Sequence, residues 1–459
     1  MSVEPFLTDP VFPQLEIASD PESMRKVFQE HLTPLGETTY RIRDCRLSRV
    51  RYRKSARCVL QYTLRLTEAD TGHERIQWVT GVMYAGDAIR RKWEKLRLLD
   101  PGKIPDVFSA FEPYAFIPDL GMLVETFPYD RRLPTLPLVM AGPSPELEPP
   151  LLARFGPGNW HTEAWNVEPV RYRAELGTTL RLTLQARDDA TGRTDERRFY
   201  AKVYHDDEEG ERTYRVLRTL QSRTGDDGER FTVAPPIAYL SGLRTLLQEE
   251  TSGTPLRDIL LQEEDTIPAV RKTARALAAL HLDDVSAPRS HPLRKEVAAL
   301  ERTGRLLRWA CPHLRGEIEE GIGAVISGLE EVPSAPTHRD LKLDHILLDG
   351  GRPALIDLDG FAEADPVLDA ANVLAHLAGM PFRFPLVSED RWWTAAQVFA
   401  DEYFALVPNA WRERLPVHYA GAILKVAVGF FRRQEPDWSD KIAILVREAE
   451  DPLAGRVRW

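Results

Sequence analysis

The chain has 459 residues, 43% of them hydrophobic and 28% charged, which is typical of a folded protein of two or three domains and excludes a disordered chain. Its net charge of -10 argues against binding to nucleic-acid backbones and favours a neutral or cationic small-molecule partner. Its cysteines are odd in number and lack CxxC spacing, so we expect neither a disulfide framework nor a zinc cluster.

The N-terminal residues 1–14 lack the basic and apolar regions of a signal peptide. No apolar run approaches the roughly 20 residues that cross a bilayer. The longest such run, 420–430, contains Lys425, and we expect it to form a buried helix. The sequence therefore predicts a cytoplasmic protein without a membrane segment.

Two parts of the chain resemble each other. Residues 50–53 and 170–173 both read VRYR, and each is followed by a strand-like run, a Thr-Gly turn, a second strand and a charged helix. The offset between the two copies is nearly constant, which predicts an internal duplication of one strand-strand-strand-helix unit. A chance likeness of two hairpin units is the alternative.

Residues 134–158 are rich in proline and glycine and have no clear helix or strand period, so we expect a linker there. A sheet-rich segment, 159–255, follows. From residue 256 on, apolar residues recur at helical spacing. The predicted helices cover 266–282, 293–309, 317–329, 367–378 and 392–406, the first with Asp265 as its N-cap. This segregation of strands and helices indicates the α+β class.

Polar residues that suit phosphoryl transfer surround a predicted hairpin. Two short apolar runs, 346–348 and 354–356, flank a glycine turn, so the residues at the two open ends of the hairpin, among them Asp340, His345 and Asp357, should converge. A carboxylate such as Asp340 can orient and deprotonate an attacking hydroxyl. His345 and Asp357 suit a metal ion, and Lys342 suits the charge of the moving phosphoryl group.

These motifs resemble known kinases. HRDLKLDH at 338–345 resembles the kinase catalytic loop, and IDLD at 356–359 resembles the metal-binding segment that follows it. With ADPVLD at 364–369, the set more closely resembles the aminoglycoside phosphotransferase-like family of small-molecule kinases, over roughly residues 165–380. The resemblance implies a protein-kinase-like fold, with a small antiparallel sheet lobe and a helical lobe that bind ATP and Mg²⁺ between them. It also implies that Asp369 braces the catalytic loop.

The resemblance further implies which residues bind the nucleotide. Lys202 is similar to the strand lysine that pairs with nucleotide phosphates, with Glu211, or alternatively Glu208, as its carboxylate partner. Gly177 lies in the loop expected to cover the phosphates. The hinge is expected to hold adenine through the backbone at Glu249, Glu250 and Thr251.

The predicted domains are a degenerate copy of the small lobe at 1–133, the linker at 134–158, the small lobe at 159–255 and the helical lobe at 256–459. The first copy has Gly81 where the second has Lys202, and no catalytic loop follows it. We therefore expect it to serve as a cap, a substrate-shaping domain or a surface for homo-oligomers. The helices at the end of the helical lobe are expected either to bind the acceptor through residues such as Trp393 or to be ordinary core.

His345 departs from the family, which usually has Asn there. In one interpretation it remains a metal ligand, and its softer nitrogen makes Mn²⁺ acceptable beside Mg²⁺. In the other, metal binding is lost and the chain is a pseudokinase that acts as a nucleotide sensor or scaffold. The retained acidic and basic residues favour activity. Asp359 either binds a second metal ion or caps the next turn.

Other residues of the motif have expected roles that are not chemical. We expect His338 to pack and hold the loop, His281 to end its helix, and Arg339 to pair with an acidic neighbour or with substrate. The stretch between Asp357 and Asp365 is too short for an activation loop, which favours a small-molecule acceptor over a protein. The predicted function is transfer of the γ-phosphate of ATP to a hydroxyl of a sugar, an amino alcohol or an aminoglycoside-like compound.

Overall fold

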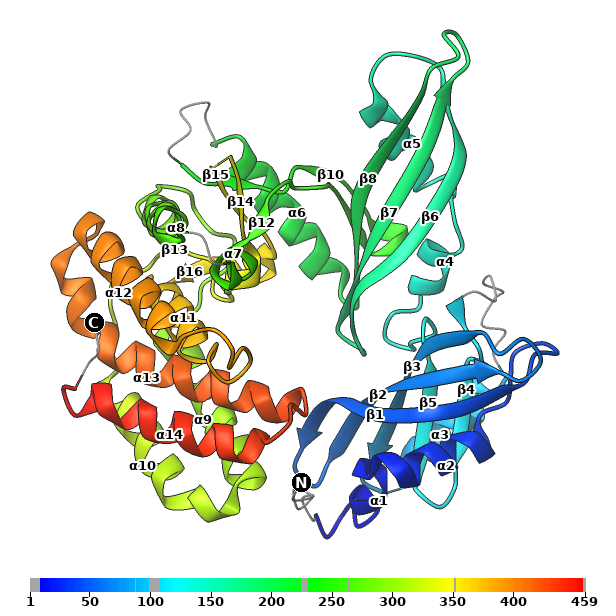
Figure 1. The fold of residues 1–459 in the computed structure, drawn as a ribbon, viewed down its shortest axis with the longest axis horizontal. Helices are drawn as coiled ribbons and strands as arrows, with labels where there is room; N and C mark the ends of the chain where they lie inside the picture. The colour runs from blue at the N-terminus through cyan, green and yellow to red at the C-terminus, as the bar shows by residue number, and fades with distance from the viewer. Residues whose placement is uncertain are drawn as a thin grey trace. The chain divides into compact units, whose positions relative to one another are not determined.

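A computed structural model describes residues 9–86, 88–98, 108–223, 230–262, 265–350 and 352–456 (Figure 1). The chain divides into two compact units. The first comprises Met1–Asp207, Ile237–Leu247 and Arg432–Pro436, and the second comprises Glu208–Pro236, Gln248–Phe431 and Asp437–Trp459. No helix in the described ranges is both long and apolar enough to cross a membrane. The three cysteines are buried and free.

The strands of the first unit form two five-stranded sheets. The first sheet has the order β1-β2-β3-β5-β4 and consists of β1 (Tyr40–Arg53), β2 (Arg57–Glu68), β3 (Glu74–Tyr84), β4 (Tyr114–Ile117) and β5 (Met122–Thr126). The second has the order β10-β11-β8-β7-β6 and consists of β6 (Trp160–Arg173), β7 (Gly177–Asp188), β8 (Thr194–Tyr204), β10 (Pro236–Leu240) and β11 (Thr245–Glu249). Corresponding strands thus occupy corresponding places in the two sheets.

Irregularities of the backbone also recur in the two sheets. The long first strand of each sheet breaks register twice against its neighbour: β1 near residues 43 and 48, and β6 near residues 163 and 170. The tight turn that follows contains a residue with positive φ in both, Ser55 (49°) and Glu175 (62°). These shared features support the predicted duplication, which stays a prediction.

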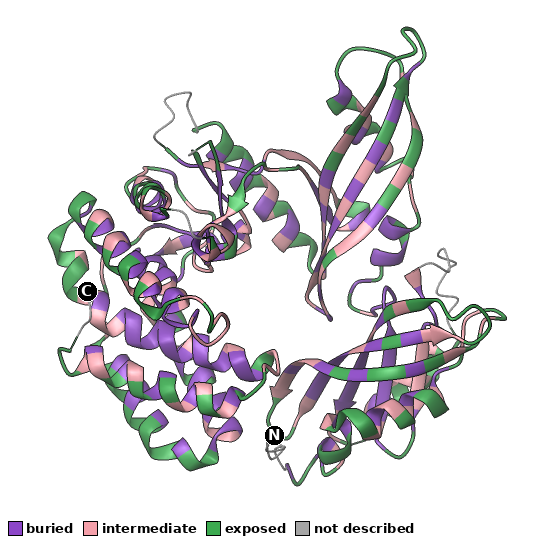
Figure 2. Ribbon diagram, viewed as in Figure 1, coloured by how far each residue is buried: buried purple, intermediate pink, exposed green. Residues whose placement is uncertain are grey.

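The sheets pack through alternating side chains. Along β7 nearly every second residue is buried, as a strand with one covered face requires (Figure 2). Helices α1 (Leu15–Ser19) and α2 (Pro21–His31) precede the first sheet. Helix α3 (Ala88–Leu96) follows β3, and helix α6 (Asp207–Gln221) follows β8.

The segment expected as a linker contains short helices, which the sequence does not predict. Residues 134–158 contain α4 (Leu136–Met140), α5 (Glu148–Leu152) and a short 3₁₀ helix (Ala153–Phe155). Their apolar side chains belong to one core cluster with residues of both sheets. Prolines in the first turn of each α-helix start these helices and do not break them. Helices of five residues are too short to show a sequence period.

The second unit is mainly helical. Its helices are α7 (Leu256–Leu261), α8 (Ile267–His281), α9 (Leu293–Ala310), α10 (Arg315–Gly328), α11 (Val367–Ala378), α12 (Glu389–Leu406), α13 (Asn409–Arg432) and α14 (Trp438–Leu453). All five helices predicted after residue 256 are therefore present, with small shifts at their ends. The run 420–430 is buried inside α13, apart from a half-buried Lys425 and Gly429. The expected N-cap of α8 is wrong: Thr266 holds that position, although Asp265 Oδ1 still accepts the Ile267 N–H at 3.1 Å.

Two small sheets lie among these helices. One has the order β12-β14-β15-β9 and consists of β9 (Thr232–Val233), β12 (Thr254–Pro255), β14 (Ile346–Asp349) and β15 (Arg352–Leu355). The other pairs β13 (Ala335–Thr337) with β16 (Ala362–Ala364). The sheets and the helical unit together give the predicted protein-kinase-like α+β fold.

Gly253 joins the hinge segment to the small sheet and tolerates no side chain. Its φ is +125°, and a Cβ there would lie 2.8 Å from the backbone carbon of Leu348 in β14. We expect Gly253→Ala to lower the free energy of unfolding by about 2–3 kcal/mol, because backbone strain and a backbone clash add.

Urea denaturation measures this effect, with Gly350→Ala as the control variant. Gly350 also has a positive φ, of +53°, but a Cβ there would meet no atom within 4 Å. The control should therefore lose only the strain contribution, about 1 kcal/mol. Equal losses in both variants would contradict the close packing of Gly253.

Candidate active site

The β14–β15 hairpin positions the polar residues that the sequence singles out. Ile346 pairs with Leu355 at its open end, and Ile356 N–H donates to the carbonyl oxygen of His345 at 3.0 Å. The strands are buried apart from the turn. The loop before β14 and the segment after β15 are therefore held side by side, as the hairpin prediction requires.

Asp340, His345 and Asp357 come together there. One ligand atom from each lies within 4.8 Å of the others, in a group that could hold a metal ion. His345 Nε2 lies 3.4 Å from Asp357 Oδ2, and His345 Nδ1 lies 2.9 Å from the carbonyl oxygen of Asp340. Lys342 Nζ donates to Asp340 Oδ2 at 2.7 Å.

The protonation of His345 follows from its surroundings. Burial lowers the pKa of His345 to about 4, so the ring is neutral at pH 7. A carbonyl oxygen can only accept, so Nδ1 carries the hydrogen and donates it to Asp340 O. Nε2 is then left with its lone pair, facing the carboxylate of Asp357. Two electron-rich atoms face each other favourably when a cation lies between them.

Asp340 is ionised in this arrangement. Partial burial opposes its charge, but the Lys342 ammonium outweighs it and holds the pKa of Asp340 below its usual value. An ionised carboxylate is the form that accepts a proton.

The loop at 338–345, which resembles a kinase catalytic loop, begins in a strained conformation that recurs after the hairpin. Arg339 and Asp357 have φ of 68° and 62°, which bulky side chains rarely adopt. Asp369 fixes the loop, because its two carboxylate oxygens accept the backbone N–H groups of His338 at 2.6 Å and Arg339 at 2.7 Å. This is the bracing geometry that the resemblance implies for Asp369.

Two buried histidines, His338 and His281, also hold the loop and Asp369 in place. His338 is buried, and its Nε2 lies 2.9 Å from the carbonyl oxygen of Ile356, so it links the loop to the hairpin, as expected. His281 does end α8, but it is also buried, with Nε2 3.2 Å from Asp369 Oδ2 and Nδ1 2.7 Å from the Tyr403 hydroxyl. This second role of His281 is not predicted from the sequence, where its only signal is the position of His281 on an apolar helix face.

Asp359 and Arg339 contact other side chains of the second unit, and their expected roles stay predictions. Asp359 lies in a 3₁₀ helix (Leu358–Gly360), where its Oδ1 accepts from Thr213 Oγ1 at 3.4 Å; it is not part of the three-residue group among the described residues. Arg339 Nη2 lies 3.4 Å from His291 Nε2, and within the described ranges Arg339 has no ion pair with an acidic neighbour.

The residues predicted to bind nucleotide are distributed over both units. In the first, Lys202 lies within β8 opposite Thr179, and Gly177 begins β7, where a Cβ would approach Val203 O to 3.0 Å. In the second, Glu211 is exposed on α6, 3.8 Å from Arg215, so its pairing with Lys202 stays a prediction.

Of the hinge residues, Glu249 ends β11, and Glu250 and Thr251 lie between β11 and β12. Glu249 N–H donates to the carbonyl oxygen of Pro235 at 2.9 Å, and Glu250 is exposed. The Thr251 hydroxyl oxygen is buried and has no hydrogen-bond partner within the described chain. A buried hydroxyl without a partner is costly.

The aromatic residues of the last helices are mostly core. Trp392 and Tyr403 are 1% and 0% exposed, whereas Trp393 and Trp411 are partly exposed. The core interpretation therefore holds for Trp392 and Tyr403, and Trp393 and Trp411 remain as candidate acceptor contacts.

Comparison with known proteins agrees with the motifs. Residues 187–413 match the model of the phosphotransferase enzyme family. This part of the chain is similar to that family. The matched residues contain the group at Asp340, His345 and Asp357, together with Asp369, Lys202 and the hinge. Gly177 and the entire first sheet precede them.

Solved structures with similar folds are distant in sequence. One is the GDP and kanamycin complex of APH(2″)-IIia, with 12% identity, a TM-score of 0.43, and coverage of 63% of this chain and 94% of that one. Another is choline kinase from Cryptosporidium parvum, with 12% identity, a TM-score of 0.44, and coverage of 63% and 89%. A third is a choline/ethanolamine kinase family protein from Mesorhizobium loti, with 11% identity, a TM-score of 0.39, and coverage of 63% and 88%. No curated protein matches the chain.

Proposed function

We propose that the chain is an ATP- and Mg²⁺-dependent phosphotransferase that moves the γ-phosphate to a hydroxyl of a small molecule in the cytoplasm. The observation that carries this proposal is the group formed by Asp340, His345 and Asp357 on a loop braced by Asp369. Phosphoryl transfer depends mainly on positioning and charge stabilisation, and this group supplies both from a rigid hairpin.

The donor set fits a divalent cation. His345 Nε2 and Asp357 Oδ2 face each other at 3.4 Å, and the hydrogen bond from Nδ1 to Asp340 O fixes the ring. In this proposal His345 and Asp357 hold the ion, and Asp359 is a candidate for a second one. A divalent ion there neutralises charge on the nucleotide phosphates.

The hinge fits the base of a nucleotide. The Glu249 amide is already used by Pro235, so we assign adenine binding to the backbone of Glu250 and Thr251, with the buried Thr251 hydroxyl as a further contact. Lys202 and the turn at Gly177 are assigned to the phosphates.

Asp340 is the proposed general base. Its carboxylate is ionised and half-exposed, so an acceptor hydroxyl can reach it. Lys342 holds the carboxylate in place at 2.7 Å and carries a positive charge next to the point where the phosphoryl group moves. No observation favours the pseudokinase alternative, and a site with base, metal ligands and lysines retained supports turnover.

Acceptor-dependent release of ADP tests the proposal. The purified chain is incubated with ATP or GTP and with Mg²⁺ or Mn²⁺, across sugars, amino alcohols and aminoglycosides. We expect release with one acceptor class and a phosphorylated product by mass spectrometry. Asp344→Asn is the matched control: Asp344 is half-exposed in the same loop and ion-paired with Arg257 at 2.6 Å, so it should retain activity. Nucleotide binding without product under every condition would contradict the proposal.

His345→Asn should change metal preference. Because an amide oxygen is a harder ligand than imidazole nitrogen, we expect the ratio of activity with Mn²⁺ to activity with Mg²⁺ to fall by about ten-fold. Initial rates at saturating concentrations of each metal ion measure this ratio, with Asp344→Asn as the control. An unchanged ratio would show that His345 is not a metal ligand.

A further inference from the structure

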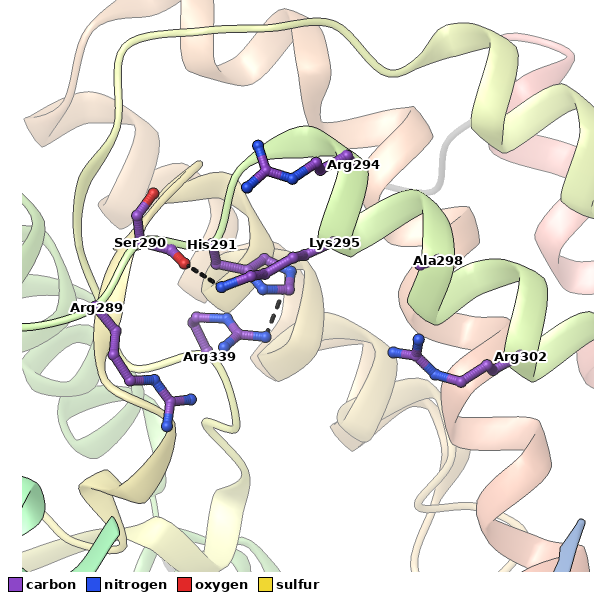
Figure 3. Close-up of a pocket in the computed structure, with 8 residues that line it drawn as sticks. All are labelled: Arg289, Ser290, His291, Arg294, Lys295, Ala298, Arg302 and Arg339. Atoms are coloured by element: carbon purple, nitrogen blue, oxygen red, sulfur yellow. Dashed lines mark hydrogen bonds between the residues drawn. The ribbon is translucent and has the colours of Figure 1, made fainter. Parts of the chain in front are cut away.

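A second concave site lies in the helical unit. A cavity of about 470 Å³ is bounded by the loop before α9, by one face of α9 and by the loop residue Arg339 (Figure 3). The residues that line it are Arg289, Ser290, His291, Arg294, Lys295, Ala298, Arg302 and Arg339.

The lining is strongly basic. It contains four arginines and one lysine and no carboxylate. None of these five cations forms an ion pair with any residue that the structure describes. Lys295 Nζ donates to the Ser290 carbonyl oxygen at 2.8 Å, and Arg339 Nη2 lies 3.4 Å from His291 Nε2. The positive charges therefore repel one another, although the nearby Glu296 carboxylate partly offsets the charge of Arg339.

Other cations of the same helix are paired. Arg305 lies 3.8 Å from Glu301, and Arg308 lies 3.1 Å from Glu319. The chain has a net charge of -10, so carboxylates are not scarce. Glu296 contacts His291 at 3.1 Å, but it is also ion-paired with Lys425 and does not line the cavity. The cavity lining therefore lacks a carboxylate, although carboxylates are common elsewhere in the chain.

The positions of the cations follow from regular structure. Arg294, Ala298 and Arg302 are four residues apart on α9 and lie on one face, where the small side chain of Ala298 leaves room between the two guanidinium groups. Arg339 is fixed from its backbone by Asp369. The helix and the braced loop thus place the backbones of these cations around one cavity, where their charges suit an anionic ligand.

We propose that this cavity binds a small multivalent anion that carries phosphate groups, a site separate from the group at Asp340. Guanidinium groups bind phosphate oxygens in pairs, so several arginines suit a diphosphate better than a single monoanion. The volume is that of a small-molecule site. The overall negative charge argues against nucleic acid as the ligand. The proposal does not depend on catalysis by the chain.

Isothermal titration calorimetry with inorganic pyrophosphate tests this site. The full chain is titrated in EDTA at constant ionic strength, as wild type, as Arg294→Ala/Arg302→Ala and as Arg305→Ala. Arg305 is the matched control, since it is a paired arginine on the same helix. We expect wild type and control to bind pyrophosphate equally and more tightly than orthophosphate. The double variant should bind at least about ten-fold more weakly, because hydrogen bonds between charged groups are lost.

Equal affinity in all three proteins would place pyrophosphate elsewhere and overturn the proposal, as would no binding to wild type. Circular dichroism establishes whether the double variant is folded. If the double variant is not folded, Arg289→Ala replaces it, since Arg289 lies in the loop before α9. This variant must then bind pyrophosphate more weakly than wild type.

Discussion

Asp340→Asn should lower the rate of phosphoryl transfer by about 10²- to 10⁴-fold, the usual contribution of a general base. Asparagine keeps the size of the side chain and can still accept the hydrogen bond from Lys342, which lies at 2.7 Å in the native loop. It cannot take the proton of an attacking hydroxyl. The affinity for nucleotide should change little, because the proposed nucleotide contacts are at Lys202 and the hinge.

Steady-state ADP release gives the rate, and nucleotide titration gives the affinity. Asp344→Asn, a neighbouring carboxylate that is ion-paired with Arg257, serves as the control and should retain the native rate. A full rate in Asp340→Asn would exclude Asp340 as the base. A loss of nucleotide affinity in parallel with the rate would instead assign Asp340 to binding.

The part of the site that sequence predicts is the part built from neighbouring residues. The group at Asp340, His345 and Asp357 depends on one hairpin, whose turn chemistry and apolar runs are visible in a short stretch of sequence. The helices after residue 256 were predictable for the same reason, since their apolar period is long enough to count.

The missed features depend on contacts between distant residues. His281 reaches Asp369 and Tyr403 from a different helix, and no local pattern marks such a network. The basic cavity joins Arg289, Arg302 and Arg339, which are separated along the chain and come together only through the packing of α9 beside the loop. The folded segment 134–158 was missed because its helices are too short for a period.

The two sheets of the first unit are joined by a buried ionic cluster around Glu175. Glu175 lies at the tight turn between β6 and β7, with φ of 62° and a side chain that is 1% exposed. Its carboxylate accepts from Arg51 at 2.6 Å and is also ion-paired with Arg57 and Arg131. Its backbone N–H donates to Asp130 Oδ2 at 2.6 Å. Glu175 thus contacts three arginines from the part of the chain that contains the first sheet, of which Arg131 is also ion-paired with Glu125 at 2.6 Å.

Glu175→Gln should therefore lower the free energy of unfolding by about 3 kcal/mol. Removing one partner of a buried ion pair leaves the remaining charge uncompensated, which costs about 3–5 kcal/mol. We expect the lower end of this range because the side chains of Arg51 and Arg57 are 26% and 22% exposed and retain some water. Urea denaturation followed by circular dichroism measures the change.

Glu168→Gln is the control for this variant. Glu168 is a half-exposed residue of β6 whose carboxylate is ion-paired with Arg181, and water already screens that pair. We expect no measurable change in its unfolding free energy. If Glu175→Gln were as stable as Glu168→Gln, the arginines would be solvated or paired in another way, and the two sheets would be joined by their apolar core alone. A large loss in Glu175→Gln only would show that this ionic cluster stabilises the contact between the two sheets.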